Sequence, residues 1–340
     1  MRFLFIGAGV IGSLYAGRLA LAGHEVELMA RGKRLAALRE RGLVLVDEAS
    51  DRFEIAPVRT VEGGDAAAPY DFVVLAVRRD QLGEALAAAA RFGEARAFVT
   101  MVNLADGGKG ASNVLGAERL VMGFPGAGGT IREDGSVAYR IVSAAIQRTT
   151  FGEASGGASE RARGLARACT AAGFPSAVSA DMSSWQRSHL ALVSPIANAV
   201  YAAGGDIVAC ARDRWLIGLM VDAIRDGFEV VRTTGASEGR GQSDSGAAAA
   251  RGARRGARVE PPKLAAMMAL PKALLVPAFA SRLASPWGET VIARHALKAR
   301  GEMRLLSDDL IGLADNAGKP APALRELARL AETRYPGKET

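Results

Sequence analysis

Cysteine, aromatic residues and long apolar runs are all scarce in this sequence. Only Cys169 and Cys210 occur among 340 residues, so there is no disulfide framework and no CxxC metal motif, and we expect no metal. No stretch offers the ~20 uninterrupted apolar residues of a membrane-spanning helix. The apolar start of the chain is interrupted at Gly7, so we expect mature structure there rather than a signal peptide. These absences favour a protein of the reducing cytoplasm with no membrane partner.

Aromatic side chains make up only 6% of the chain. The net charge is +7, from 43 basic and 36 acidic residues, and the basic residues are mostly dispersed. Because aromatic residues do not alternate with basic ones, the stacking platforms of nucleic-acid-binding proteins are not indicated. We therefore expect no nucleic-acid partner. A basic cleft that attracts an anionic cofactor and a small anionic substrate explains the charge more simply.

The first residues carry a glycine-rich motif. Residues 6–12 read Ile-Gly-Ala-Gly-Val-Ile-Gly, between a short apolar run and a helical stretch, and a second apolar run follows at residues 23–30. Strand, turn, helix and strand thus arrive in the order that a dinucleotide site requires. Gly7 permits the tight turn, Gly9 lets the backbone approach the pyrophosphate, and Gly12 allows the helix to pack closely on the strand. The motif predicts a dinucleotide cofactor, with the phosphates at the helix N-terminus.

The end of the second apolar run indicates which dinucleotide is bound. Sites for NAD usually place an acidic residue there to bond the ribose 2′-OH, but this chain has Ala30 followed by Arg31, and its acidic residues Glu25 and Glu27 come too early. A guanidinium at this place suits a 2′-phosphate, so the sequence favours NADP(H). The alternative is a solvated basic loop over residues 31–34, since surface arginine and lysine are common.

Length and patterning predict two domains, an α/β domain over residues 1–180 and an all-helical domain over residues 181–335. The first is expected to be a Rossmann-type doubly wound parallel sheet, because its apolar runs are nearly continuous and alternate with helical stretches. A segment at about residues 236–262, rich in Gly, Ala, Ser and Arg, is predicted to be flexible. The remaining strands are expected at residues 70–77, 97–102, 120–123, 141–146 and 149–152. A hairpin is expected at residues 130–139, with a type I′ turn at Asp134-Gly135. The remaining helices are expected at 85–90, 161–172, 184–203, 212–233, 264–283, 290–314 and 323–335.

Several of these motifs, in this order, resemble those of the ketopantoate reductase family (2-dehydropantoate 2-reductases and their relatives). The glycine motif resembles the opening of that family, and Ala30-Arg31-Gly32 resembles its site for the NADP phosphate. The stretch at residues 75–81 resembles a V-K-x-x-Q pattern, with Arg78 where lysine is usual and Gln81 retained. Met101-Val102-Asn103 resembles a Q-N-G turn of the family, keeping Asn103 but with Leu104 in place of the glycine. Trp185-Gln186-Arg187 resembles the W-x-K start of the first helix in the second domain. The resemblance implies an NADPH-dependent reductase of a 2-oxo acid or a related carbonyl compound.

The second-domain helix departs from the family pattern. The catalytic lysine corresponds to Arg187, and the two asparagines that follow it at four-residue steps correspond to Ala191 and Pro195. Arginine can hold an oxyanion with paired N–H donors, but its pKa above ~12 makes it a poor proton source. His189 is the nearest alternative acid, although two residues apart on a helix point to different sides. The catalytic candidates are therefore Arg187, Asn103 and His189, with a packed or solvent-facing histidine as the alternative for His189.

Polar residues that follow the central strands are expected to bind the cofactor. Arg78 comes after the strand at residues 70–77, at the sheet edge where doubly wound proteins bind ligands, and is expected to contact a cofactor phosphate or a substrate carboxylate. Asn103 follows the next strand and is expected to orient the nicotinamide ribose or the substrate. Ordinary loop polarity is the alternative for both.

Three functions remain open from the sequence alone. The first is the NADPH-dependent reductase, acting on a small anionic substrate, with a homodimer as the candidate assembly. The second is an NADPH-binding sensor without catalysis, which the lost lysine and asparagines favour. The third is an opine-type dehydrogenase, which shares the plan of a dinucleotide-binding domain followed by helices.

Overall fold

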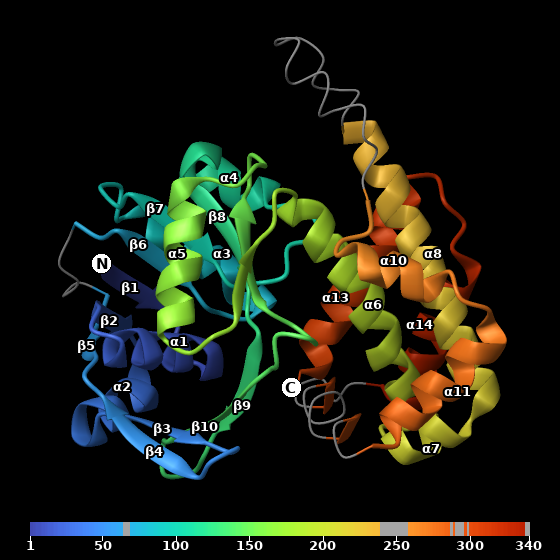
Figure 1. Ribbon diagram of the computed structural model, residues 1–340, viewed down its shortest axis with the longest axis horizontal. Helices are drawn as coiled ribbons and strands as arrows, with labels where there is room; N and C mark the ends of the chain where they lie inside the picture. The colour runs from blue at the N-terminus through green and yellow to red at the C-terminus, as the bar shows by residue number, and fades with distance from the viewer. Residues whose placement is uncertain (64–68, 239–257, 286–287, 290–295, 298, 337–340) are drawn as a thin grey trace. The chain divides into compact units, whose positions relative to one another are not determined.

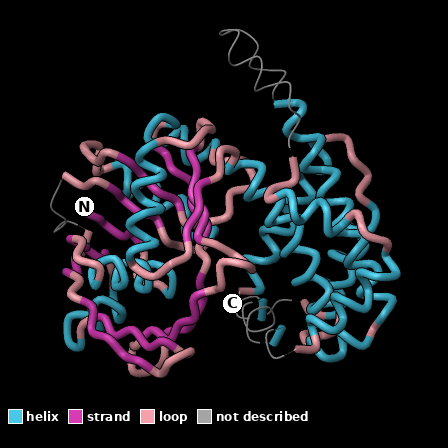
Figure 2. Tube along the Cα trace, viewed as in Figure 1, coloured by secondary structure: helices cyan, strands magenta, loops and turns pink. Residues whose placement is uncertain are grey.

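The computed structural model describes residues 1–63, 69–238, 258–285, 288–289, 296–297 and 299–336. The chain divides into two compact units, Met1–Ser183 and Ser184–Thr340. Strands and helices alternate in the first unit, whereas the described part of the second is helical (Figures 1 and 2). The predicted fold class, an N-terminal α/β domain followed by helices, is confirmed.

The N-terminal unit is built on an eight-stranded sheet, ordered β12-β11-β8-β7-β6-β1-β2-β5. Strand β1 pairs in parallel with both β2 and β6, whereas β8 pairs in antiparallel orientation with β11. The central strands carry apolar residues on both faces because helices cover both. Helix α1 contacts α5, and α3 contacts α4. The strands are β1 (Arg2–Ile6), β2 (Glu25–Met29), β5 (Arg59–Val61), β6 (Phe72–Leu75), β7 (Ala97–Thr100), β8 (Leu120–Phe124), β11 (Thr149–Glu153) and β12 (Ser176–Val178), and the helices are α1 (Val10–Leu21), α2 (Gly32–Arg41), α3 (Leu82–Ala90), α4 (Lys109–Leu115) and α5 (Glu160–Ala171).

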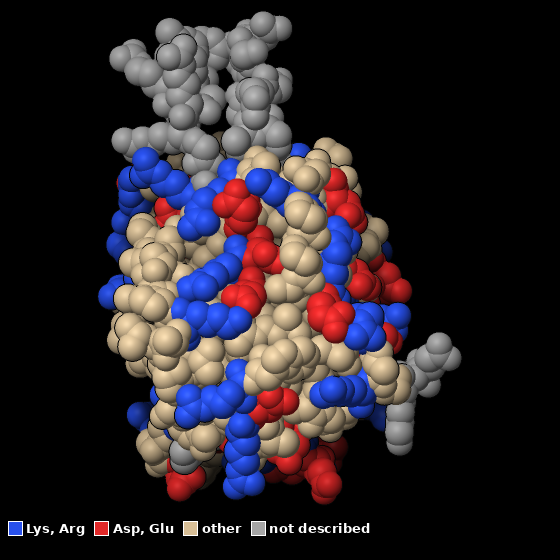
Figure 3. Space-filling model, turned by 90° about the vertical axis from the view of Figure 1, so that its right-hand side faces the viewer, with Lys and Arg blue, Asp and Glu red and all other residues tan. Residues whose placement is uncertain are grey.

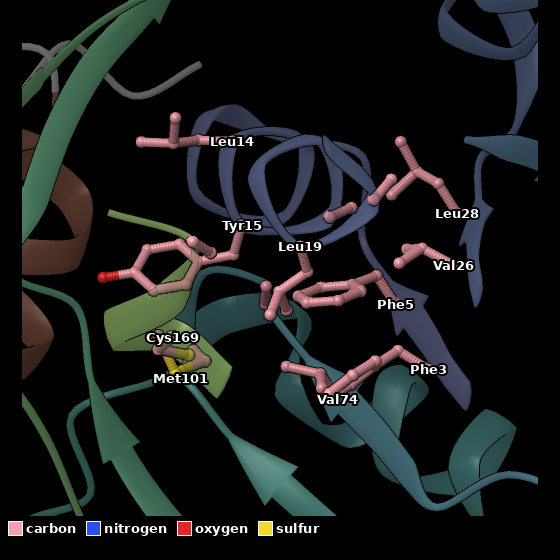
Figure 4. Packing of buried hydrophobic residues seen from close by; sticks show 14 of the residues in the cluster. Phe3, Phe5, Leu14, Tyr15, Leu19, Val26, Leu28, Val74, Met101 and Cys169 are labelled. Atoms are coloured by element: carbon pink, nitrogen blue, oxygen red, sulfur yellow. The ribbon is translucent and has the colours of Figure 1, made fainter. Parts of the chain in front are cut away.

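The core of this unit lies where α1 packs on the sheet. Phe5 and Leu19 are 1% exposed and lie against each other between α1 and the strands, with Phe3 and Val74 on the sheet side (Figure 4). Burial of such side chains contributes roughly 1.5–3 kcal/mol each, so this contact fixes α1 against β1. The glycine-rich turn that joins them is thereby fixed as well.

A second, four-stranded sheet, ordered β4-β3-β10-β9, completes the unit. Its strands are β3 (Leu43–Asp47), β4 (Arg52–Ala56), β9 (Ala127–Ile131) and β10 (Val137–Ile141), and strands β3 to β5 were not predicted. Helix α1 packs on this sheet at Gly17, where an added Cβ would lie 2.8 Å from a methyl carbon of Leu45. The sheet is therefore assembled from two distant segments of the chain around one small residue.

The hairpin of this sheet forms as predicted, but the predicted turn type was wrong. A type I′ turn needs positive φ at both central residues. Gly135 has φ +84°, whereas Asp134 is not among the residues with positive φ. The Asp134 carboxylate instead accepts hydrogen bonds from the backbone N–H and the hydroxyl of Ser136, at 2.9 and 2.7 Å, which holds a longer loop with a left-handed glycine. The predicted strand at 141–146 was also wrong, because β10 ends at Ile141 and a turn follows.

The helical unit is organised around one long helix, α8, which contacts α11, α13 and α14. Residues 264–283 were predicted as one helix, but the chain breaks there and the two helices are bent by 114°. Pro271 explains the break, since it lacks an N–H donor and restricts the residue before it. The helices are α6 (Met182–Ala202), α7 (Ile207–Arg212), α8 (Arg214–Glu238), α10 (Pro262–Met268), α11 (Lys272–Leu283), α13 (Arg300–Asn316) and α14 (Pro322–Arg334).

Two predictions fall partly outside the described residues. Of the segment expected to be flexible, residues 239–257 are not described, and α8 continues to Glu238 before them. Of the helix expected at 290–314, residues 290–295 and 298 are not described, and α13 begins at Arg300. Within the described residues, no single helix has both the length and the apolar composition to cross a membrane, although the bent pair α10 and α11 meets that criterion jointly.

Candidate functional site

The order of the large sheet creates a switch point between β1 and β6. From β1 the chain continues through α1 to β2 on one side, and from β6 it continues through α3 to β7 on the other. Loops that leave the carboxyl ends of such neighbouring strands diverge and leave a crevice for a ligand. Of the predicted cofactor residues, the three glycines follow β1, Arg31 follows β2, Arg78 and Gln81 follow β6, and Asn103 follows β7.

The three glycines meet three different steric demands. Gly7 has φ +109°, and a Cβ there would lie 2.6 Å from the carbonyl oxygen of Ala76. A Cβ on Gly12 would lie 1.9 Å from the carbonyl oxygen of Gly7, so the turn and α1 contact each other directly. A Cβ on Gly9 meets nothing within 4 Å. The turn is therefore closed on the protein side and open at Gly9, the N-cap of α1, which is the shape that a pyrophosphate needs.

Arg31 lies at the N-cap of α2, and its side chain is 80% exposed. It contacts Glu84 of α3 at 3.3 Å, an exposed ion pair that contributes little to stability and leaves the guanidinium available to a stronger anion. Glu27 in β2 is buried and bound to Arg59 and Tyr70, at 2.8 and 2.6 Å, so it is engaged inside the fold rather than at the strand end.

Asn103 is 7% exposed, and neither its amide nitrogen nor its amide oxygen has a hydrogen-bond partner in the described part of the chain. The hydroxyl of Thr100, at the end of β7, is also buried and unpartnered there, and sequence reasoning did not single it out. A buried polar group without a partner costs about 1–3 kcal/mol. Such groups at the carboxyl end of a central strand point to a ligand with its own donors and acceptors, so the residues present fit a nicotinamide dinucleotide.

Arg78 and Gln81 lie at the same sheet edge, around a short 3₁₀ helix (Arg79–Gln81) that leads into α3. The Arg78 side chain is exposed and contacts Asp80, with two N···O distances of 3.3 Å. Gln81 is half-buried and is the N-cap residue of α3. Both follow β6 at the sheet edge of the predicted cofactor site, and the exposed pair with Asp80 leaves Arg78 available to an anion.

The remaining candidates, Arg187 and His189, lie on α6 of the helical unit. Arg187 is 2% exposed. His189 is half-buried, and its ring stacks on that of Trp185, one turn earlier, with the centroids 5.4 Å apart and the planes within 5°. This stacking fixes the His189 ring along a different side of α6 from Arg187.

The structure gives a packing reason for one departure from the family pattern. An added Cβ on Gly227 of α8 would lie 2.9 Å from the Cβ of Ala191, so α6 and α8 cross closely at a pair of small residues. An asparagine at position 191 would extend into that crossing. Further along α6, Asn198 is buried and donates a hydrogen bond to Ser307 of α13 at 2.9 Å. Neither this pair nor Arg34, described below, was found by sequence reasoning.

Comparisons with known proteins point to one family for the N-terminal part of the chain. Residues 3–156 match the family model described as ketopantoate reductase PanE/ApbA. Over 202 residues, the chain is 32% identical to a 2-dehydropantoate 2-reductase of Mesorhizobium japonicum, a match that covers 54% of this chain and 61% of that protein. The N-terminal part of this chain is thus similar to the ketopantoate reductase family, which supports the predicted resemblance. The chain spans only about three-fifths of that relative's length.

Solved structures extend the likeness of fold to nearly the whole chain. A 2-dehydropantoate 2-reductase from Geobacter metallireducens is 15% identical with a TM-score of 0.72, covering 98% of this chain and 99% of that one. D-mandelate dehydrogenase with NADH and anilino(oxo)acetate is 13% identical with a TM-score of 0.68, covering 98% of each chain. Members of the ketopantoate reductase family are NAD(P)H-dependent oxidoreductases, so a nicotinamide cofactor is established at the level of the family.

Proposed function

We propose that this protein is an NADPH-dependent reductase of a small, anionic 2-oxo acid or a related carbonyl compound. One observation carries the proposal: the buried amide of Asn103, which has no hydrogen-bond partner in the described part of the chain, lies at the carboxyl end of β7, at the sheet edge where the glycine turn opens. The choice of NADPH rests on Arg31 at the end of β2, where no acidic residue stands to bond a ribose hydroxyl.

The chain's own residues have separable tasks. Gly7, Gly9 and Gly12 shape the turn for the pyrophosphate, Arg31 binds the 2′-phosphate, and Asn103 orients the nicotinamide ribose or the substrate. When bound, NADPH supplies the hydride for the carbonyl carbon. Arg78 and Gln81 contribute polar contacts to cofactor or substrate at the same edge.

The substrate-side chemistry is assigned to α6. Arg187 holds the negative charge that develops on the carbonyl oxygen, with paired N–H donors. Because a guanidinium keeps its proton, another group has to supply the proton to that oxygen. His189 is the candidate acid on the same helix, although its ring, stacked on Trp185, lies along a different side of α6 from Arg187.

A second function is favoured by one observation. Ala191 packs against Gly227 where the family pattern has a substrate-side asparagine, which supports an NADPH-binding sensor without turnover. An opine-type dehydrogenase remains the third candidate.

The expected cytoplasmic location, the homodimer, and the absence of nucleic-acid and membrane partners stay predictions. On the face of the helical unit that Figure 3 shows, basic and acidic side chains are interspersed.

One experiment separates the three functions. NADPH binding is measured by fluorescence, and NADPH oxidation is followed with a panel of 2-oxo acids, each with and without amines. Oxidation with a 2-oxo acid alone supports the reductase, and oxidation that requires an amine supports the opine-type enzyme. Binding without oxidation across the panel supports the sensor, and failure to bind either nicotinamide dinucleotide contradicts all three.

A further inference from the structure

Arg34, in the first turn of α2, reaches into the glycine-rich turn. Its Nε donates a hydrogen bond to the carbonyl oxygen of Ala8 at 3.1 Å, and its Nη2 donates to the hydroxyl of Ser13 at 3.1 Å. The Ser13 hydroxyl in turn donates to the same Ala8 oxygen at 3.1 Å. The central alanine of the motif is therefore held from two sides by a closed network, and the turn keeps one conformation.

The same guanidinium also holds a distant part of the chain. Its Nη1 donates to the carbonyl oxygen of Gly135, in the β9–β10 hairpin, at 2.6 Å. Arg41, in the last turn of α2, donates to the neighbouring carbonyl of Asp134 at 3.0 Å. Arg41 thus ties α2 to the hairpin alone, whereas Arg34 ties α2 to both the hairpin and the glycine-rich turn.

The charge of Arg34 is not balanced by a carboxylate. Its acceptors are two backbone carbonyls and a hydroxyl, and in the described residues no acidic side chain pairs with it. Burial lowers the pKa of this half-buried guanidinium. In contrast, Arg31 and Arg78 each lie against an acidic side chain. A partly buried cation without a counter-charge costs free energy, which an incoming anion offsets.

We propose that Arg34 is a positioning residue for the cofactor: it fixes the glycine-rich turn through Ala8 and Ser13 and supplies positive charge that the dinucleotide pyrophosphate balances. The inference rests on the proposed function, because it requires a dinucleotide at this turn. The pyrophosphate is common to NADH and NADPH. Arg34 therefore strengthens the binding of both, whereas Arg31 acts on NADPH alone.

The test compares Arg34→Gln with Arg41→Gln, a matched change on the same helix that also loses a bond to the hairpin. Dissociation constants for NADPH and NADH are measured by fluorescence titration of the full chain, and thermal unfolding is followed in parallel. We expect Arg34→Gln to weaken both dinucleotides by about 10-fold, as expected for lost hydrogen bonds from a charged donor. Arg41→Gln should stay within about twofold of the unmodified protein, since surface changes have small effects.

Arg34→Lys keeps the positive charge but loses the paired N–H donors of the guanidinium, so we expect it to weaken the binding of both dinucleotides by less than Arg34→Gln does. If Arg34→Gln does not fold, Arg34→Lys provides the test. Equal binding by Arg34→Gln and the unmodified protein overturns the inference, and so do equal losses in Arg34→Gln and Arg41→Gln. A loss confined to NADPH also overturns it, because Arg34 would then read the 2′-phosphate. If the unmodified protein binds neither dinucleotide, the proposed function fails first and the inference with it.

Discussion

In the N-terminal unit, two of the candidate cofactor glycines stand where no side chain fits, whereas in the helical unit the substrate candidates lie along a helix. Gly7 and Gly12 are required by contacts of less than 3 Å from an added Cβ to backbone oxygens. Arg187 and Ala191 occupy helical positions of α6, where the neighbouring side chains and helices, rather than the backbone conformation, decide which residue fits. The predicted cofactor turn therefore depends on backbone conformation and close backbone contacts, whereas the predicted substrate chemistry depends on side chains of α6.

The largest expected effect comes from Gly12→Ala. The added methyl group would lie 1.9 Å from the carbonyl oxygen of Gly7, so either the turn or α1 has to move. We expect a loss of roughly 3 kcal/mol or more in the free energy of unfolding, since overpacking against backbone is poorly relieved. Denaturant unfolding measures the loss, and NADPH titration should show no binding.

Gly9→Ala is the matched control for that change. Its methyl group meets nothing within 4 Å, and Gly9 has φ −73°, which alanine adopts readily. We expect stability to change by less than about 0.5 kcal/mol while dinucleotide affinity falls, because the methyl group occupies the space for the pyrophosphate. Unchanged affinity in Gly9→Ala would place the phosphates elsewhere.

Arg187→Ala tests the helical side of the comparison. We expect turnover of a confirmed 2-oxo acid to fall by roughly 10²-fold, as when an oxyanion donor is lost, with NADPH affinity unchanged. Arg187→Lys restores a titratable group and should raise activity toward ketopantoate. His189→Gln tests whether the His189 imidazole supplies the proton to the carbonyl oxygen of the substrate. Full turnover in Arg187→Ala would mean that the catalytic position of the family has been carried over to the wrong residue.

Ala191→Asn sharpens the comparison, because it restores the asparagine of the family pattern at a position where this structure leaves no room for the longer side chain. The longer side chain meets α8 at Gly227, so we expect a destabilisation of about 1–3 kcal/mol and no gain in turnover. Ala209→Asn, at an exposed position in α7, controls for helix propensity and should cost under about 1 kcal/mol. Equal unfolding free energies for the two variants would contradict the close crossing of α6 and α8.

The smallest expected effect is a change of cofactor preference in Arg31→Asp. The exposed guanidinium is replaced by a charge that repels the 2′-phosphate, so the ratio of NADPH to NADH affinity should fall by about 10-fold or more, with unfolding unaffected. Dissociation constants for the two dinucleotides measure the ratio. Equal affinities for NADH and NADPH in the unmodified protein would remove the basis of this prediction.

The local features of the fold were predictable from the sequence. The continuous apolar runs at β6 and β7 and the spacing of the three glycines predict a parallel sheet with a dinucleotide turn, because they depend on a few neighbouring residues. Helix α6 was placed within two residues at its start. The resemblance to the ketopantoate reductase family could also be recognised from short motifs.

Tertiary structure decided what depends on distant partners. The pairing of β3 with β10, the loop that Asp134 and Ser136 close, and the small-residue crossing of Ala191 with Gly227 each join groups that the local pattern does not relate. The sequence assigned no role to Arg34, whose contacts with Ala8 and Gly135 arise only when the chain folds. The physical reason is that residue type and spacing determine backbone conformation locally, whereas a side chain's role depends on which acceptors and charges the folded chain places around it.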